Sequence, residues 1–476
     1  MMITFILNNK KISTDLPSGM VTLDFIRRSE RLVGTKESCR EGDCGACLIL
    51  VGEWDGKAVS YQSINSCLLP LAELHGKHVV TIEGLNNHGL SPIQQAIVDE
   101  GATQCGYCTP GIVISLTSFF CNQSHFDENQ AIAALDGNIC RCTGYQAIKR
   151  AASQLCRKLN SSVLSDTKKN HLKWLVDAQI LPHYFLQIPE QLHKLSLANN
   201  EVATKNASEA IIVAGGTDLW VQKPTELYNA NLMILSQRKD LKGIRIKQNS
   251  YYIGATTSIE EIKKSHIIHK FFPKINDYFK RIASTPIRHR ATLGGNIVNA
   301  SPIGDLTVFF LALETSITIT DFPNKRKLAL KDFFKAYKQV DKHNNELVEE
   351  ISFPLPTQKT FFNFEKVSKR THLDIASVNS AIQIVIDNDM IQQVHLSAGG
   401  VAPIPLYLSR TVNYLRGKKI HIDSIREATS IAQSEISPIS DVRGSADYKR
   451  LLLRQLIYAH FITLFPERFN EGEVLR

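Results

Sequence analysis

The 476-residue sequence has no long hydrophobic run and no G-x-G-x-x-G motif. No apolar stretch reaches the ~18–20 residues that a membrane span needs, and the first residues lack the basic segment and apolar core of a secretory signal. These absences lead us to expect a cytoplasmic protein without a membrane partner. The missing G-x-G-x-x-G motif gives no support to a Rossmann dinucleotide domain.

Blocks of like charge are also missing. The net charge of +9 comes from 55 Lys and Arg against 46 Asp and Glu, and the densest basic run is only Lys168-Lys169. Hydrophobic residues make up 43% and charged residues 21% of the chain, which is typical of a globular protein with an ample core. We therefore expect a mildly basic protein that does not bind nucleic acid, with roughly three domains for this length.

Cysteine is absent from residues 157–476, because all ten cysteines lie between Cys39 and Cys156. In a cytoplasmic chain, cysteines at short spacing indicate metal or redox sites rather than disulfides. Cys121 and Cys156 lie within helical patterns and are expected to be buried thiols. The other eight form two quartets, which are Cys39, Cys44, Cys47 and Cys67, and Cys105, Cys108, Cys140 and Cys142.

The first quartet reads C-x4-C-x2-C with a fourth cysteine further on, which is the spacing of plant-type [2Fe–2S] ferredoxins. Structural zinc usually shows two separated C-x2-C knuckles, so iron–sulfur is favoured over zinc. Gly42 and Gly45 allow tight bends that aim backbone N–H groups at the sulfurs. A hairpin at Ile3–Leu7 and Lys10–Leu16 and a strand at Leu48–Val51 complete a β-grasp-like pattern.

The second quartet combines C-x2-C with C-x-C, a spacing that by itself leaves zinc and iron–sulfur both open. Its position beside a ferredoxin-like domain favours a second [2Fe–2S] cluster. Four helices are predicted around it, and helix N-termini stabilise the negative charge of thiolate-bound iron. The predicted helices are 91–101, 109–120, 127–135 and 145–157.

Two glycine-rich segments in the later part of the chain could hold a flavin. A buried strand at Ala210–Val213 runs into Ala214-Gly215-Gly216-Thr217-Asp218-Leu219, which could cradle a diphosphate or form only a tight turn. A second segment, Thr292–Asp305, is rich in Gly, Asn and Ser and ends in one carboxylate. Iron–sulfur centres carry single electrons, whereas NADH carries pairs, and a flavin connects the two regimes. We therefore expect FAD in this domain.

Seven motifs together resemble the molybdenum hydroxylase family, and within it the small iron–sulfur/FAD subunits of bacterial xanthine dehydrogenases. The resemblance covers nearly the whole chain. Where the family often has Asn, this chain has His289, which we expect to be a structural loop residue. The matching motifs are Glu37–Cys47, Gln104–Gly111, Gly137–Tyr145, Val213–Leu219, Ala291–Asp305, Asp374–Val378 and Asp441–Tyr448.

The resemblance implies a multidomain α+β fold. It has a β-grasp ferredoxin-like [2Fe–2S] domain, a four-helix [2Fe–2S] domain, an α+β FAD-binding domain of the PCMH/vanillyl-alcohol-oxidase type and a C-terminal α+β domain. The implied boundaries are 1–87 for the ferredoxin-like domain, 88–158 for the helical domain, 159–180 for a polar linker, 181–353 for the FAD domain and 354–476 for the C-terminal domain.

The resemblance also implies site residues. Both cysteine quartets would bind iron, and Gln104 would lie where the second cluster faces a partner chain. No residue of this chain would be catalytic in hydroxylation. The residues implied to bind FAD are Ile212, Val213, Ala214, Gly215, Gly216, Thr217, Asp218, Leu219, Thr292, Gly295, Asn296, Asn299, Ser301, Asp305, Val348 and Lys366.

The implied function is electron transfer in xanthine dehydrogenase. Electrons from a molybdopterin-binding large subunit, which oxidises hypoxanthine or xanthine to urate, would pass through two [2Fe–2S] clusters to FAD and then to NAD+. The implied assembly is a heterotetramer of two small and two large subunits. Other molybdenum hydroxylases acting on aldehydes, nicotinate or carbon monoxide, and a stand-alone flavin–iron–sulfur reductase, remain alternatives. Fusion of the iron–sulfur and flavin domains in one chain favours xanthine. NAD+ and oxygen as terminal acceptors are not distinguished by any motif.

Overall fold

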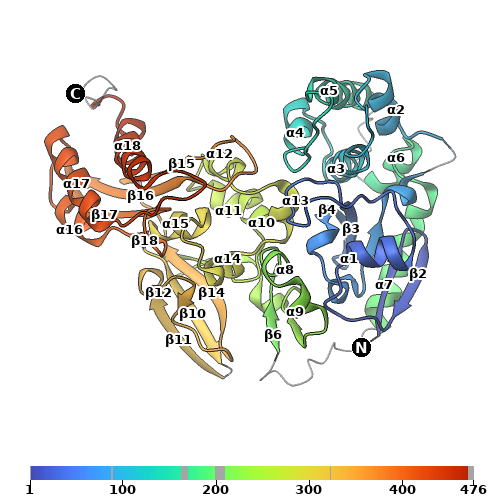
Figure 1. The fold of residues 1–476 in the computed structure, drawn as a ribbon, viewed down its shortest axis with the longest axis horizontal. Coiled ribbons are helices and arrows are strands. Elements are labelled where there is room, and N and C mark those ends of the chain that lie inside the picture. The colour runs from blue at the N-terminus through green and yellow to red at the C-terminus, as the bar shows by residue number, and fades with distance from the viewer. Residues whose placement is uncertain (1, 87–88, 162–169, 199–209, 322, 470–476) are drawn as a thin grey trace. The chain divides into compact units, whose positions relative to one another are not determined.

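The computed structural model describes residues 2–86, 89–161, 170–198, 210–321 and 323–469. It divides into two compact units (Figure 1). The first comprises Met1–Ile234 with Ser284–Arg290, and the second comprises Leu235–Ala283 with Ala291–Arg476. Each unit is described by itself below.

The first unit begins with a five-stranded mixed sheet in the order β2-β1-β5-β3-β4, in which β1 and β5 are parallel. Ile3, Phe5 and Leu7 of β1 enter one core of this sheet, while Ile6 points to the other face and packs with residues of α7 (Ile188–Ala198). This alternation follows from the two-residue period of a strand, and the predicted hairpin is confirmed. The strands are β1 (Ile3–Leu7), β2 (Lys10–Thr14), β3 (Leu48–Trp54), β4 (Val59–Asn65) and β5 (His78–Val80).

Four helices follow, and they confirm the predicted helical domain. Ser91 caps the first in a reciprocal capping box with Gln94, and Pro92 occupies its first position. Residues Gly111–Phe120 of α3 are buried on every side, so this helix forms the centre of the domain. The helices are α2 (Pro92–Asp99), α3 (Thr109–Asn122), α4 (Glu128–Ala133) and α5 (Gln146–Asn160).

The segment predicted as a polar linker, 159–180, contains a helix in its second half. Residues 162–169 lie outside the described residues, but α6 (His171–Asp177) belongs to the helical domain. Leu175 is buried in its core and Trp174 stacks on Phe126. The polar composition before residue 170 concealed an apolar face that the domain uses.

The rest of the first unit holds short elements around the first glycine-rich segment. Strand β6 ends at Val213, as the sequence predicted, and α8 begins at Leu219. Trp220 of α8 is buried, and its Nε1 donates a hydrogen bond to the carbonyl oxygen of Gly19 at 3.1 Å. The elements are α1 (Thr22–Asp24), β6 (Ile211–Val213), α8 (Leu219–Gln222), α9 (Pro224–Tyr228), β7 (Leu232–Ile234) and α13 (Thr285–Arg290).

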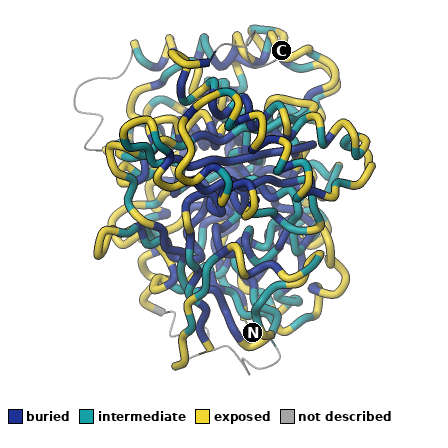
Figure 2. The backbone as a smooth tube through the Cα atoms, turned by 90° about the vertical axis from the view of Figure 1, so that its left-hand side faces the viewer, coloured by how far each residue is buried: buried dark blue, intermediate teal, exposed yellow. Residues whose placement is uncertain are grey.

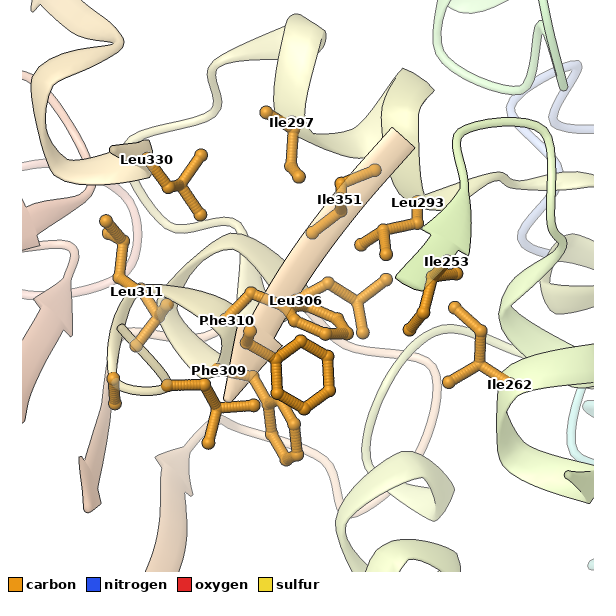
Figure 3. Close-up of a cluster of buried hydrophobic side chains, with 14 of the residues drawn as sticks. Ile253, Ile262, Leu293, Ile297, Leu306, Phe309, Phe310, Leu311, Leu330 and Ile351 are labelled. Carbon is orange, nitrogen blue, oxygen red and sulfur yellow. The ribbon is translucent and has the colours of Figure 1, made fainter. Parts of the chain in front are cut away.

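The second unit contains a five-stranded antiparallel sheet in the order β11-β10-β14-β9-β8. Its core joins strand residues such as Ile253 and Ile351 to the helix residues Leu306, Phe309 and Phe310, which Figure 3 shows gathered together. Full burial of such a side chain contributes about 1.5–3 kcal/mol to stability. The elements are β8 (Ile244–Lys247), β9 (Ser250–Gly254), α10 (Ile259–Lys264), α11 (His266–His269), α12 (Ile275–Lys280), α14 (Leu293–Asn299), α15 (Asp305–Leu311), β10 (Ser316–Asp321), β11 (Asn324–Ala329), β12 (Phe334–Ala336), β13 (Gln339–Val340) and β14 (Leu347–Pro354).

A four-stranded antiparallel sheet in the order β15-β16-β17-β18 completes the second unit. Its two central strands, β16 and β17, are largely buried; buried backbone is dark blue in Figure 2. The last helix, α18, spans Ala446–Leu464. The elements are β15 (Thr360–Val367), β16 (Val378–Asp387), β17 (Met390–Gly399), β18 (Leu406–Tyr407), α16 (Ser409–Leu415), α17 (Ile422–Glu435) and α18 (Ala446–Leu464).

The predicted multidomain α+β fold is confirmed. The domain boundaries stay a prediction. None of the helices in the described ranges combines the length and the apolar character that a membrane crossing requires.

Candidate iron–sulfur and flavin sites

The first cysteine quartet converges as two pairs of thiols. The sulfurs of Cys39 and Cys44 lie 3.2 Å apart, and those of Cys47 and Cys67 lie 3.3 Å apart. Both distances exceed the about 2.05 Å of a disulfide, and all four thiols are free. A negative charge on Cys39 opposes ionisation of Cys47 and of Cys67, so the two pairs lie near one another.

Backbone groups of the cysteine loop support the thiolate form. The N–H groups of Glu41 and Cys44 each donate to the sulfur of Cys39 at 3.4 Å. The hydrogen bond from the Cys44 thiol, followed by these backbone N–H groups, lowers the pKa of Cys39 to about 5. These contacts favour the thiolate of Cys39, which is the form of cysteine that binds metal.

The second quartet also converges in pairs, at the ends of helices in the helical domain. The sulfurs of Cys105 and Cys142 lie 3.5 Å apart, and the thiols of Cys108 and Cys140 hydrogen-bond each other. Cys108 is the N-cap residue of α3, and burial raises the pKa of its thiol to about 12. Cys105 and Cys142 are exposed, whereas Cys140 is buried.

This pairing fits the binding of two irons by each quartet. A [2Fe–2S] cluster distributes four cysteine thiolates over two iron atoms, whereas structural zinc places four ligands around one ion. In each quartet the thiols meet two by two. The residues present therefore fit a [2Fe–2S] cluster at each quartet.

A narrow seam joins the two cysteine loops. The N–H of Ile139 donates to the carbonyl oxygen of Cys44 at 3.0 Å, so a residue next to Cys140 touches a residue of the first quartet. Gly45 makes this approach possible, because a Cβ there would lie 2.2 Å from the carbonyl oxygen of Gly137 and its φ is +70°. The sequence alone did not reveal this contact.

The first glycine-rich segment, Ile212–Leu219, lies in the first unit and has the features of an anion-binding turn. Within the described part of the chain, the backbone N–H groups of Gly215, Gly216 and Thr217 donate no hydrogen bond. Gly216 has a φ of +70°, and a Cβ there would meet the ring of Trp220 at 2.8 Å. Unused N–H groups in a glycine turn are what a diphosphate needs, so these residues fit the predicted role.

The second glycine-rich segment lies in the second unit. Thr292 caps α14 by accepting a hydrogen bond from the N–H of Gly295 at 3.1 Å. Asn296 accepts a hydrogen bond from Thr307, and Asn299 accepts one from Lys338. Ser301 is half-buried in this segment, and Val348 is buried in β14.

Asp305 is engaged by two residues of the C-terminal sheet. Its carboxylate accepts hydrogen bonds from Lys366 Nζ at 2.7 Å and from Asn379 Nδ2 at 2.6 Å. Lys366 is 1% exposed and also donates to the carbonyl oxygens of Arg281 and Asp374, each at 2.7 Å. An ammonium has three donors, and all three donors of Lys366 are used within the protein. Lys366 therefore holds the carboxylate of Asp305 in place.

Several residues of this arrangement escaped sequence reasoning. Asn379 directly follows the motif Asp374–Val378, and its position next to that motif was a signal in the sequence that it belongs to this arrangement. Arg290 contacts Gly215 and Asp136 contacts Arg288, each across more than seventy residues of sequence. No local pattern in the sequence indicated these contacts.

Protein-family comparisons identify four domains along the chain. They are the 2Fe-2S iron–sulfur cluster binding domain at 5–72, the [2Fe-2S] binding domain at 81–153, the FAD binding domain in molybdopterin dehydrogenase at 189–356 and the CO dehydrogenase flavoprotein C-terminal domain at 364–464. Two [2Fe–2S] domains and one FAD domain define an iron–sulfur flavoprotein. In this order the domains match the iron–sulfur/FAD small subunit of the molybdenum hydroxylases, which confirms the resemblance seen in the sequence.

Individual relatives agree with this assignment. The chain is 27% identical to a xanthine dehydrogenase of Blastobotrys adeninivorans over 99% of this chain and 41% of the relative, and 25% identical to aldehyde oxidase 2 of Mus musculus over 97% and 39%. It therefore spans about two fifths of the length of these curated relatives. A solved carbon monoxide dehydrogenase structure from Hydrogenophaga pseudoflava shares the fold, with a TM-score of 0.52 and 24% identity, over 55% of this chain and 91% of that one.

Proposed function

We propose that this chain is the electron-transfer subunit of a xanthine dehydrogenase. Electrons leave a molybdopterin-binding large subunit, pass singly through two [2Fe–2S] clusters and collect on FAD, which reduces NAD+. The cluster ligands are the eight cysteines of the two quartets. FAD supplies the change from single electrons to pairs, and the chain's own residues bind and orient it.

The observation that carries this proposal is the exposed thiol pair Cys105 and Cys142 in a domain otherwise built around a buried helix. Gln104 and Tyr107 beside the pair are also exposed. A cluster at this pair lies at the surface, where a partner's redox centre can approach it. We therefore propose that this face docks the large subunit, as part of an assembly of two small and two large subunits.

Support for xanthine as the substrate comes from the relatives. Xanthine dehydrogenases of several organisms match nearly the whole of this chain. Aldehyde oxidase 2 matches over a similar length, so an aldehyde is the competing substrate class. The substrate is chosen by the partner chain, which makes reconstitution the decisive experiment.

The test is to assay this chain alone and with its co-purifying molybdopterin subunit. The chain alone should transfer electrons from NADH to an artificial dye but should not oxidise xanthine. Addition of the partner should restore xanthine-dependent reduction of NAD+. Turnover of an aldehyde but not of xanthine would replace the proposed substrate, and xanthine oxidation by the isolated chain without molybdenum would refute the division of labour.

A further inference from the structure

Three consecutive basic residues at the end of α13 bind three different segments of the first unit. Arg288 Nη2 lies 2.9 Å from Asp136 Oδ2 in the helical domain. His289 Nδ1 lies 3.1 Å from the carbonyl oxygen of Ser63 in the ferredoxin-like domain. Arg290 binds the carbonyl oxygen of Gly215 in the first glycine-rich segment. Only the last of these contacts reaches a residue with a predicted ligand.

Arg290 holds Gly215 with two donors. Its Nη2 lies 2.7 Å and its Nε 3.2 Å from the Gly215 carbonyl oxygen. The same Nη2 lies 3.3 Å from Glu73 Oε1, and Lys77 Nζ lies 3.6 Å from Glu73 Oε2. The side chains of Arg290 and Glu73 are 7% and 0% exposed. Buried charges are costly unless they are paired, so Glu73 keeps the guanidinium in place.

This contact determines the direction of an N–H group. In a planar trans peptide the carbonyl oxygen and the following N–H point in opposite directions. Because Arg290 fixes the oxygen of Gly215, it also directs the N–H of Gly216 away from itself. That N–H has no protein partner within the described residues. A cation behind the carbonyl also polarises the peptide, which strengthens its N–H as a donor.

We propose that Arg290 is a positioning residue for the FAD diphosphate, acting through the Gly215–Gly216 peptide. This inference rests on the proposed function, in which the first glycine-rich segment binds FAD. Arg290 orients the donor from behind without touching the ligand. Arg290 supports binding of the diphosphate, whereas binding of the isoalloxazine ring does not depend on Arg290.

The experiment compares three ligands on metal-replete protein stripped of flavin, namely FAD, ADP and riboflavin. FAD and ADP contain the diphosphate, and riboflavin lacks it. The main variant is Arg290→Met with Glu73→Gln, which removes the buried pair without leaving Glu73 opposite a missing charge. Arg290→Lys is a second variant, which keeps the charge but loses the bidentate contact. The matched control is Arg288→Met with Asp136→Asn, which removes a similarly buried pair on the same helix.

We expect the main variant to bind FAD and ADP about tenfold more weakly, because the Gly216 N–H loses the orientation and polarisation that Arg290 provides. Riboflavin binding and both iron EPR signals should stay unchanged, and Arg290→Lys should show a smaller loss. The control should bind all three ligands like the wild type. Unchanged FAD affinity, or an equal loss for riboflavin, would overturn the positioning role. Failure of the wild type to bind FAD would instead refute the proposed flavin site.

Discussion

Cys108 combines two properties at one residue, because it is a thiol of the second quartet and the N-cap of α3. Asp305 likewise combines a place in a glycine-rich segment with a contact to the buried Lys366. We therefore expect each side chain to affect both a cofactor and the packing around it. The effect of a substitution on its cofactor can be separated from its effect on packing only when the other cofactor sites are measured at the same time.

Replacement of Cys108 by Ser should remove one cluster and leave the other, because the quartets lie in separate domains. EPR spectra of the reduced protein should lose one of two [2Fe–2S] signals. Cys121→Ser is the control, since Cys121 is half-buried and lies outside both quartets, and it should keep both signals. Loss of both signals from a folded Cys108→Ser variant would contradict independent sites.

Replacement of Asp305 by Ala should deplete FAD while both iron signals persist. The structure adds a stability effect, because loss of this carboxylate leaves Lys366 buried without its anionic partner, at a cost of about 3–5 kcal/mol. Flavin content, EPR and the unfolding midpoint measure the three effects. The double variant Asp305→Ala with Lys366→Met should regain stability but not FAD. Full flavin occupancy in both variants would show that Asp305 has no role in the flavin site.

At the scale of elements, β5 carries a buried histidine that connects three segments. His78 Nε2 lies 2.8 Å from the carbonyl oxygen of Asn8, and its Nδ1 lies 2.8 Å from the hydroxyl of Tyr61. Donation to Asn8 and acceptance from Tyr61 satisfy both ring nitrogens of the neutral form. Burial lowers the pKa of His78 to about 4, although the contact with Asn8 raises it.

The shift in the pKa of His78 makes the ferredoxin-like domain sensitive to mild acid. In the unfolded chain His78 takes up a proton below its ordinary pKa of 6.5, whereas in the folded chain it stays neutral down to about pH 4. The free energy of unfolding therefore falls as pH decreases from about 6.5 to about 4. From pH 7 to 5.5 the loss should be about 1 kcal/mol. His78→Gln should be less stable at pH 7 but show a smaller decrease in unfolding midpoint between these pH values. An equal decrease in both proteins would exclude His78 as the cause.

At the scale of the whole molecule, all ten cysteines lie in the first unit. The second unit contains no cysteine and is built on two antiparallel sheets. The two glycine-rich segments are divided between the units. The first glycine-rich segment therefore shares a unit with both cysteine quartets, whereas the second lies in the unit without cysteine.

Purified chain should contain about four iron atoms and one FAD, from two [2Fe–2S] clusters and one flavin domain. Iron, acid-labile sulfide and released flavin can be measured on the same sample. Denaturation should release the flavin, because we expect it to be bound non-covalently. The ratio of FAD to iron should be about one to four. Stoichiometric zinc without acid-labile sulfide would contradict the iron–sulfur assignment.

Local signals account for the parts of the fold that were predicted. The hairpin that begins at Ile3–Leu7 and the helix that begins near Ser91-Pro92 each depend on neighbours within one or two turns or strands. The segment 171–177 was missed because its helix gains stability from Phe126 and the domain core, which lie far away in sequence.

The sequence by itself determined the chemistry, because thiol number and spacing are covalent properties of the chain. Cys39, Cys44 and Cys47 can share one loop in any fold that bends at Gly42 and Gly45. Only the tertiary structure decided how the quartets divide into pairs, which pair is exposed, and which charges support the glycine-rich segments. Arg290 meets Gly215 and Glu73, and Lys366 meets Asp305, across long stretches of chain. Such contacts arise from the packing of whole elements, and no short segment of sequence contains the energy that selects them.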